Sequence, residues 1–258
     1  MMDAGPAVTA PTLTVQKALG TGGRANSADQ FKVSILNGTS SAVLGTGNTT
    51  GTGRTVTGGL ASITGDSATR YKVVEEMLPG SVSNLTQYNA SLSCTNANSA
   101  GTQFPAGTVS LGQNFPLLVA GDQVSCTVTN TAKPVTLQVR QMVLSPVPVN
   151  LKPPFTFSYT GNNGWSAAPL TNTSLNTVVS SAAVQLTATN TSTTVSTTLP
   201  EPRWFVSSFN CTDTNAAITG NPTGNLATSL STSVTVPAAN VRSGAALRCT
   251  LLMGHYTP

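Results

Sequence analysis

Three side chains that can take part in amide chemistry lie on strand-like segments of a chain with few charges. Lys17 ends the alternating run LTVQK, Glu75 ends YKVVE, and Asn130 ends CTVTN. Charged residues make up only 8% of the chain, against about 25% in an average globular domain. In a chain with so few charges, a lysine and a glutamate on alternating strands are less readily explained as ordinary solvent-exposed residues. Each residue also fits a plainer role: an edge-strand lysine, an acidic turn at Glu75 and Glu76, and a strand-ending asparagine before a proline linker.

The four cysteines are the second set of reactive side chains. Cys94 and Cys126 lie in the first half of the chain, and Cys211 and Cys249 lie in the second. No CxxC pair occurs and the single histidine is His255, so a zinc site lacks ligands. One disulfide in each half is predicted, which indicates an oxidising compartment. Four buried free thiols are the alternative.

Chemistry on an external substrate has little support in the sequence. His255 stands alone near the C-terminus, so no Ser-His-Asp arrangement is indicated. The acidic residues form no motif typical of a glycosidase. Asp213, in the segment DTN, indicates a turn, because the surrounding oxygen ligands are too sparse for calcium. We expect no metal, no cofactor and no enzymatic activity of this kind.

The composition favours an all-β protein. Thr and Val favour strands, Gly, Asn and Pro favour turns, and no long segment has helical spacing. The net charge of +4 comes from scattered Lys and Arg residues, so a nucleic-acid partner is not expected. No apolar run is long enough to span a bilayer. Residues 1–11 do not resemble a signal peptide and are expected to be a disordered or vector-derived N-terminus, with targeting and anchoring segments outside the chain.

The two halves of the chain repeat each other. LTVQKALG corresponds to TLQVRQMVL, FKVSI to FTFSY, and AGDQVSCTVTN to RSGAALRCTLLM. Short alternating runs broken by turn residues predict a β-sandwich for each half, spanning residues 12–132 and 133–258. The alignment pairs Lys17 with Arg140, Asn130 with Met253, and Glu75 with Ser196 or Thr197.

The order of the motifs in residues 12–132 resembles that of the CnaB / SpaA-like domains of bacterial surface proteins and pili. Those domains carry a lysine on the first strand, a YxLxE-like strand and an asparagine on the last strand. Here the middle motif is Tyr71-Lys-Val73-Val-Glu75, with Val73 in place of leucine. The resemblance covers the first half well and the second half in outline only. It implies two tandem Ig-like or prealbumin-like β-sandwiches.

The resemblance also implies an intramolecular isopeptide bond between Lys17 and Asn130, with Glu75 as the proton shuttle. A buried lysine has a lowered pKa, and a protonated carboxyl group can polarise an amide carbonyl. Lys32, Lys72 and Lys133 are rival amines, although Lys72 faces away from Glu75 and Lys32 is expected to be exposed. The second half lacks all three groups, so we expect no isopeptide bond there and a disulfide as its covalent crosslink.

Two functions follow as hypotheses. The first is a structural stalk or spacer module of an exported bacterial surface protein, adhesin or pilus-like fibre, with other domains of that protein as partners. The alternative is a ligand-binding adhesin head that binds a glycan or host surface through the second domain. Trp165 and Trp204 are the candidates for stacking on a sugar, although tryptophan in a sandwich core is more common. Both hypotheses place the protein outside the cell, at the bacterial surface.

Overall fold

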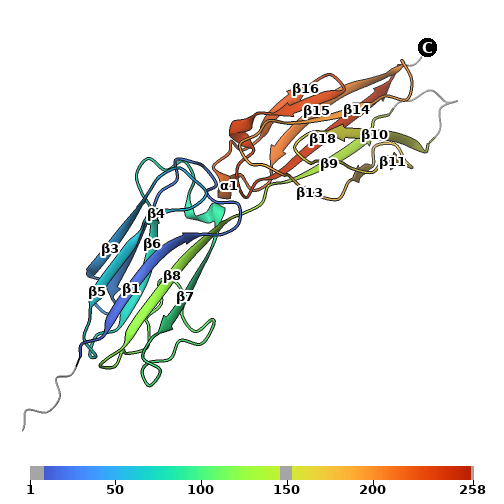
Figure 1. The fold of residues 1–258 in the computed structure, drawn as a ribbon. Coiled ribbons are helices and arrows are strands. Elements are labelled where there is room, and N and C mark those ends of the chain that lie inside the picture. Colours follow the sequence, from blue (N-terminus) through green and yellow to red (C-terminus); the bar gives the residue numbers. More distant parts are fainter. Residues whose placement is uncertain (1–8, 146–152, 257–258) are drawn as a thin grey trace, which may run out of the picture. The chain divides into compact units, whose positions relative to one another are not determined.

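A computed structural model of the chain describes residues 9–145 and 153–256. The chain divides into two compact units, residues 1–132 and 133–258. Each unit is built almost entirely of strands (Figure 1), which confirms the all-β prediction. Within the described ranges, no helix is long and apolar enough to cross a membrane.

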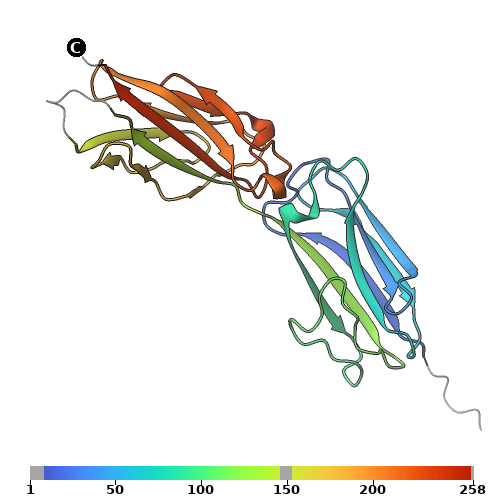
Figure 2. The same ribbon diagram turned by 180° about the vertical axis from the view of Figure 1, so that it is seen from behind.

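The first unit consists of two four-stranded sheets that enclose a core. In one sheet β1 lies between β5 and β8 and is parallel to β8, and Figures 1 and 2 show these strands side by side. The strands of this sheet, in spatial order, are β5 (Leu60–Thr64), β1 (Thr12–Leu19), β8 (Gln123–Ala132) and β7 (Tyr88–Asn96). The other sheet contains β4 (Thr57–Gly58), β3 (Val43–Thr50), β2 (Phe31–Asn37) and β6 (Tyr71–Met77), and the 3-10 helix η1 (Leu85–Gln87) precedes β7.

The second unit has the same plan. Strand β9 is parallel to β18, as β1 is to β8. The larger sheet contains β12 (Val178–Ser180), β9 (Thr136–Val143), β18 (Ala246–His255), β15 (Trp204–Asp213) and β16 (Asn225–Ser229), and β13 (Val184–Gln185) also pairs with β9. The smaller sheet contains β11 (Leu170–Asn172), β10 (Phe155–Gly161), β14 (Thr193–Thr198) and β17 (Ser233–Val236), while α1 (Ala216–Thr219) and η2 (Ala238–Asn240) lie in connections.

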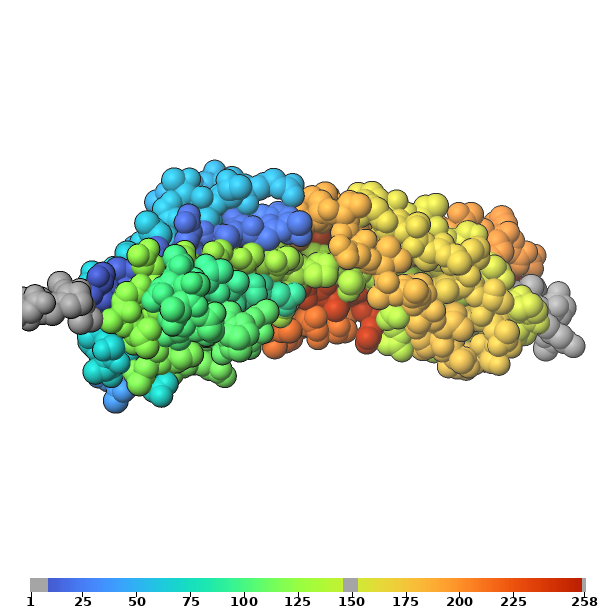
Figure 3. All heavy atoms as spheres, turned by 60° about the horizontal axis from the view of Figure 1, so that its bottom comes forward, coloured from blue at the N-terminus to red at the C-terminus, as the bar shows by residue number. Residues whose placement is uncertain are grey.

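Strand alternation determines which side chains enter each core. In β8 the inward positions are Val124, Cys126, Val128 and Asn130, all nearly inaccessible to solvent. The residues between β7 and β8, 97–122, are mostly exposed and form part of the green surface in Figure 3. Most buried apolar side chains of the first unit, including Leu13, Val33 and Val73, pack into one cluster, and Ala25, Phe31 and Tyr88 form a second, smaller cluster. An inward polar residue is therefore surrounded by apolar atoms.

The segment expected to be a disordered leader is partly held in place. Residues 1–8 lie outside the described residues. The carbonyl of Thr9 accepts a hydrogen bond from Gly121, and the carbonyl of Pro11 accepts one from Gly65. These bonds attach residues 9–11 to the end of the sandwich, so the ordered chain begins before residue 12.

Candidate functional site

Lys17, Glu75 and Asn130 meet in the core of the first unit. Lys17 and Asn130 come from the parallel neighbours β1 and β8, where Lys17 lies opposite Val128 and Leu19 lies opposite Asn130. Glu75 comes from β6 in the facing sheet and shares its inward side with Tyr71 and Val73. The two sheets thus bring together residues that are far apart in sequence.

Glu75 bridges the other two side chains. Its Oε1 lies 3.1 Å from Lys17 Nζ and accepts a hydrogen bond of 3.0 Å from Asn130 Nδ2. The side chains of Lys17 and Glu75 are 0% and 2% exposed, and Asn130 is fully buried. Glu75 as a whole residue is more accessible because β6 is an edge strand, but its carboxyl group is in the core. The three groups are positioned for mutual proton transfer.

The remaining contacts of the Lys17 amine hold it in place. Nζ donates hydrogen bonds to the carbonyl oxygens of Ala18, at 2.9 Å, and Val128, at 3.1 Å. It also lies 4.8 Å from the centre of the Phe31 ring, which is itself fully buried. The amine thus contacts two carbonyl oxygens, one carboxylate and one aromatic ring directly, and these contacts restrict its position.

Burial shifts both ionisable groups toward their neutral forms. Loss of solvation lowers the pKa of Lys17 to about 8, although attraction to the Glu75 carboxylate acts in the opposite direction. Burial likewise raises the pKa of Glu75, against the effects of Lys17 and Asn130. A neutral amine beside a protonated carboxyl group is therefore closer in free energy to the ion pair than it would be in water. That neutral pair is the nucleophile and acid that amide exchange requires.

Two oxygen atoms at this site are buried without a hydrogen-bond partner among the described residues: Glu75 Oε2 and Asn130 Oδ1. Each unsatisfied buried polar atom costs about 1–3 kcal/mol. A proton on Glu75 Oε2 supplies a donor, and the carbonyl oxygen of Asn130 is an acceptor. The site therefore contains one unpaired carboxyl oxygen and one unpaired amide oxygen, on the two side chains that the hydrogen bond from Nδ2 to Oε1 joins.

The rival amines of the first unit lie at the surface. Lys32 pairs with Glu76 at 2.8 Å, with side chains 30% and 61% exposed. Lys72 donates a hydrogen bond to Ser41. Neither amine contacts Asn130 or Glu75, and Lys133 belongs to the second unit.

Gly59 allows the chain to pass directly over Lys17. Its carbonyl accepts a hydrogen bond from the Lys17 backbone N–H, and its φ is +73°. A Cβ added there would lie 2.8 Å from Lys17 Cβ and 2.8 Å from Thr49 Cγ2. We predict that Gly59→Ala lowers the free energy of unfolding by about 1–3 kcal/mol, because the clash adds to the strain of a left-handed residue. Chemical denaturation checks this, with Gly53→Ala, which meets no atom within 4 Å, as the control; equal stability of the two variants would contradict it.

The disulfides join Cys94 to Cys126 and Cys211 to Cys249. Each lies between directly opposed residues of neighbouring strands, β7 with β8 and β15 with β18. No free cysteine remains. Each unit therefore has one disulfide between its last strand and an adjacent strand.

The expected match of Lys17 with Arg140 is wrong by one residue. Val15 lies opposite Cys126 in the first unit, and Val139 lies opposite Cys249 in the second. The residue two positions further on is Lys17 in one and Gln141 in the other. A one-residue shift moves a side chain to the other face of a sheet, and Arg140 accordingly lies on the outside while Gln141 is fully buried.

Gln141 takes part in an uncharged network. Its Oε1 accepts a hydrogen bond of 2.6 Å from the Tyr159 hydroxyl, and its Nε2 donates one of 2.6 Å to Asn172 Oδ1. Asn172 Nδ2 donates to the carbonyl of Thr177. Burial raises the pKa of Tyr159 well above its usual value, so its hydroxyl stays protonated and is a poor nucleophile. Met253 lies at the position of Asn130 and is buried.

Neither tryptophan can stack on a ligand. Trp165 is 2% exposed and donates a hydrogen bond from Nε1 to the carbonyl of Leu137. Trp204 is 5% exposed and packs edge-on against Phe155, Phe157 and His255. The hypothesis of a sugar site built on these rings is therefore wrong, because both rings complete the core of the second unit.

His255 and Asp213 both have local partners. His255 Nε2 lies 2.8 Å from Glu201 Oε1, a pair that the sequence does not indicate because no motif links the two. Asp213 accepts hydrogen bonds from the backbone of Asn215 and Ala246 and from the side chains of Thr219 and Asn221. The Asp213 carboxylate thus stabilises the turn that follows β15.

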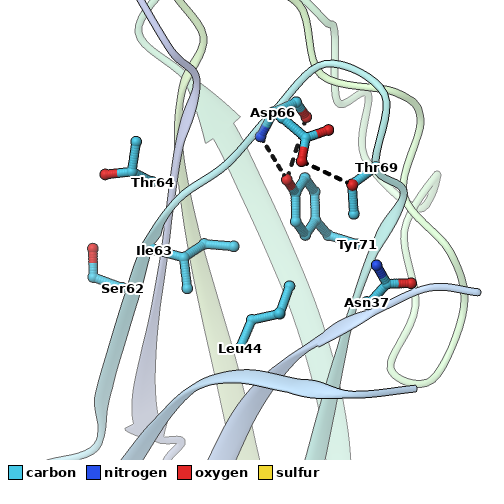
Figure 4. Close-up of a pocket in the computed structure, with 8 residues that line it drawn as sticks. All are labelled: Asn37, Leu44, Ser62, Ile63, Thr64, Asp66, Thr69 and Tyr71. Carbon is cyan, nitrogen blue, oxygen red and sulfur yellow. Dashed lines mark hydrogen bonds between the residues drawn. The ribbon is translucent and has the colours of Figure 1, made fainter. Parts of the chain in front are cut away.

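A pocket of about 400 Å³ lies apart from the buried triad, in the first unit. Figure 4 shows the Tyr71 ring pointing toward Asp66, whose backbone N–H donates to the Tyr71 hydroxyl. Thr69 donates to the Asp66 carboxylate. Asp66, Thr69 and Tyr71 thus bond to one another. The lining of the pocket is Asn37, Leu44, Ser62, Ile63, Thr64, Asp66, Thr69 and Tyr71.

Two family profiles, each described as a prealbumin-like fold domain, match residues 12–132 and 149–253. The chain is a tandem of SpaA-like prealbumin-fold domains. The matches cover most of the chain, and each falls within one compact unit. The family assigned from the motifs Lys17, Tyr71 to Glu75 and Asn130 is thereby confirmed.

Several solved structures are similar to the two prealbumin-like domains. The major pilin of Streptococcus pyogenes is 11% identical with a TM-score of 0.32, over 96% of this chain and 99% of that one. The Bacillus anthracis TIE protein is 10% identical with a TM-score of 0.38, over 96% and 34%. A Mobiluncus mulieris adhesin with disulfide, isopeptide and ester crosslinks is 9% identical with a TM-score of 0.32, over 89% and 86%. These likenesses are loose, so the assignment depends on the two family matches. No curated protein sequence matches the chain.

Proposed function

We propose that the chain is a stalk or spacer module of an exported bacterial surface protein, adhesin or pilus-like fibre, and that its first domain forms an isopeptide bond autocatalytically. The observation that carries the proposal is the buried contact of Lys17, Glu75 and Asn130. The disulfides are consistent with an extracellular location. Other domains of the same surface protein are the expected partners.

The proposed reaction exchanges one amine for another on the Asn130 side chain. Transfer of a proton from the Lys17 ammonium to Glu75 leaves a neutral amine and a carboxylic acid. Nζ attacks Cγ of Asn130 while the protonated Glu75 donates its proton to Oδ1, which gives a tetrahedral intermediate. Glu75 then takes a proton from Nζ and passes it to the Asn130 nitrogen. The Cγ–Nδ2 bond breaks, ammonia leaves, and the Oδ1 proton returns to Glu75. The products are one secondary amide, one ammonia and a protonated Glu75, and transfer of that proton to the departing ammonia restores the carboxylate.

The bond would join the first strand of the domain to the last. Force applied at residues 12 and 132 would enter through β1 and leave through β8. The load would then pass from Lys17 to Asn130 directly, and residues 18–129 would not be stretched. A module that does not extend under load is suited to a stalk.

Single-molecule pulling on the full chain tests this function. The first domain is expected to add no contour length beyond its folded size. The second domain is expected to unfold and lengthen, except for the loop that Cys211 and Cys249 close. Asn130→Leu, which removes the reacting amide, restores extension of the first domain if the proposal is correct. Extension of the first domain in the unmodified chain, by all of its length except the loop closed by Cys94 and Cys126, would rule it out.

A further inference from the structure

The net positive charge of the chain is confined to the second domain. Residues 1–132 contain six basic and six acidic side chains, whereas residues 133–258 contain six basic and only two acidic ones. Those two are Glu201 and Asp213, and both are engaged: Glu201 contacts His255, and Asp213 accepts four hydrogen bonds in its turn. The arginines of this domain therefore have no free carboxylate nearby.

Two of these arginines are neighbours on the outer face of the larger sheet. Val139 and Gln141 on β9, and Leu247 and Cys249 on β18, point into the core, so Arg140 and Arg248 point outward. Arg140 lies opposite Thr250, and Arg248 lies opposite Gln138. The two arginines are thus diagonal neighbours on adjacent strands, with Cβ atoms on the order of 7 Å apart.

Polar side chains surround the two arginines. Across the sheet, β15 places Asn210 opposite Thr250 and Thr212 opposite Arg248. The sheet face thus carries, over three strands labelled in Figure 1, the outward side chains of Gln138, Arg140, Arg248, Thr250, Asn210 and Thr212.

This polar set is incompletely paired. Among the described residues, neither Arg140 nor Arg248 forms an ion pair or a side-chain hydrogen bond, and the buried atoms Arg248 Nε and Asn210 Oδ1 have no partner. Two like charges side by side, one with an unsatisfied buried donor, form an arrangement that a bound anion would stabilise.

We propose that this face, centred on Arg140 and Arg248, binds an acidic polysaccharide through its carboxylate or sulfate groups. A guanidinium group binds such anions with two parallel hydrogen bonds, and the Thr, Asn and Gln side chains offer partners for sugar hydroxyls. A protein partner fits less well, because protein interfaces are centred on large apolar side chains. The only large, well-exposed hydrophobic side chain described on this sheet is Val178, at its edge strand. The proposal goes beyond the stalk function and does not depend on the isopeptide bond.

Calorimetric titration of the full chain with heparin and with hyaluronate, at low and physiological salt, tests the proposal. We expect binding to at least one, weakened about tenfold for each arginine replaced in Arg140→Gln and Arg248→Gln. The matched control is the double variant Arg54→Gln/Arg203→Gln, which removes the same charge at two exposed positions. Its affinity for the polysaccharide should stay close to that of the wild type. Arg54 and Arg203 are exposed, and Arg140 and Arg248 are half-buried with outward side chains. Thermal unfolding of each variant should stay close to that of the wild type, which shows that a loss of affinity is not a loss of folding.

Four results would overturn the proposal. These are no binding to either polysaccharide, an unchanged affinity in the Arg140→Gln/Arg248→Gln variant, and an equal loss in the control pair, which would indicate a general charge effect. The fourth is equally tight binding of poly-glutamate, which would assign the face to acidic peptides. Neutral dextran should not bind in any variant.

Discussion

Replacing Glu75 by alanine is expected to leave the first domain without its isopeptide bond and with a much lower stability. The variant leaves Lys17 without its only carboxylate and Asn130 Nδ2 without its acceptor. Removing one partner of a buried ion pair costs about 3–5 kcal/mol. Loss of a crosslink between residues 17 and 130 removes about another 5 kcal/mol in the chain-entropy description. Chemical denaturation with intact-mass measurement on the same sample checks both effects.

Glu76 provides the matched control for this prediction. Its carboxylate pairs with Lys32 at the surface, so Glu76→Ala should cost less than about 1 kcal/mol and leave the crosslink intact. The double variant Lys17→Met/Glu75→Leu separates the two effects, because it removes the crosslink without leaving an unpaired buried charge. Its stability should fall between those of the wild type and Glu75→Ala. Equal stability of Glu75→Ala and Glu76→Ala would contradict the account.

The second large effect is expected from the disulfide of the second domain. Cys211 and Cys249 are separated by 38 residues, so replacing both by alanine should lower the free energy of unfolding by about 4 kcal/mol. This domain has the neutral network of Gln141 in place of Lys17, Glu75 and Asn130, so no covalent crosslink within it would remain. Hydrogen exchange in the full chain, followed separately for each domain, measures the loss.

Cys94→Ala/Cys126→Ala is the corresponding variant of the first domain. The free energy of unfolding of that domain should fall by a similar amount, but the bond from Lys17 to Asn130 should still crosslink it. In these variants, the most protected amides of the second domain should therefore exchange through complete unfolding of the domain at a lower denaturant concentration than those of the first domain. The account fails for the second domain if its protection is unchanged when Cys211 and Cys249 are replaced.

The strand pattern and motif order were sufficient to predict the triad. Lys17, Glu75 and Asn130 each lie on an alternating strand with apolar neighbours on the same face, so their inward direction follows from parity. The disulfide pairs were predictable because one pair occurs in each repeat. In both cases the information is local, or is repeated within the chain.

The equivalence of Lys17 and Gln141 follows from the same alternation, because Leu137, Val139 and Gln141 match Leu13, Val15 and Lys17. Matching by charge selected Arg140 instead, and the pairing of β9 with β18 shows the error. The contact of His255 with Glu201, and the burial of Trp165 and Trp204, by contrast depend on packing between distant segments. Side-chain type alone does not show on which side of a sheet such a ring lies.

Intact mass spectrometry of the unmodified chain is the most direct test of the isopeptide bond. The account predicts a mass lower than that of the sequence by one ammonia, beyond the two hydrogens lost for each disulfide, and a digest should contain one branched peptide joining Lys17 to Asn130. Glu75→Gln and Asn130→Leu should each abolish the ammonia loss and the branched peptide. An unmodified chain that shows no ammonia loss, or a branch at Lys32 or Lys72, would contradict the account.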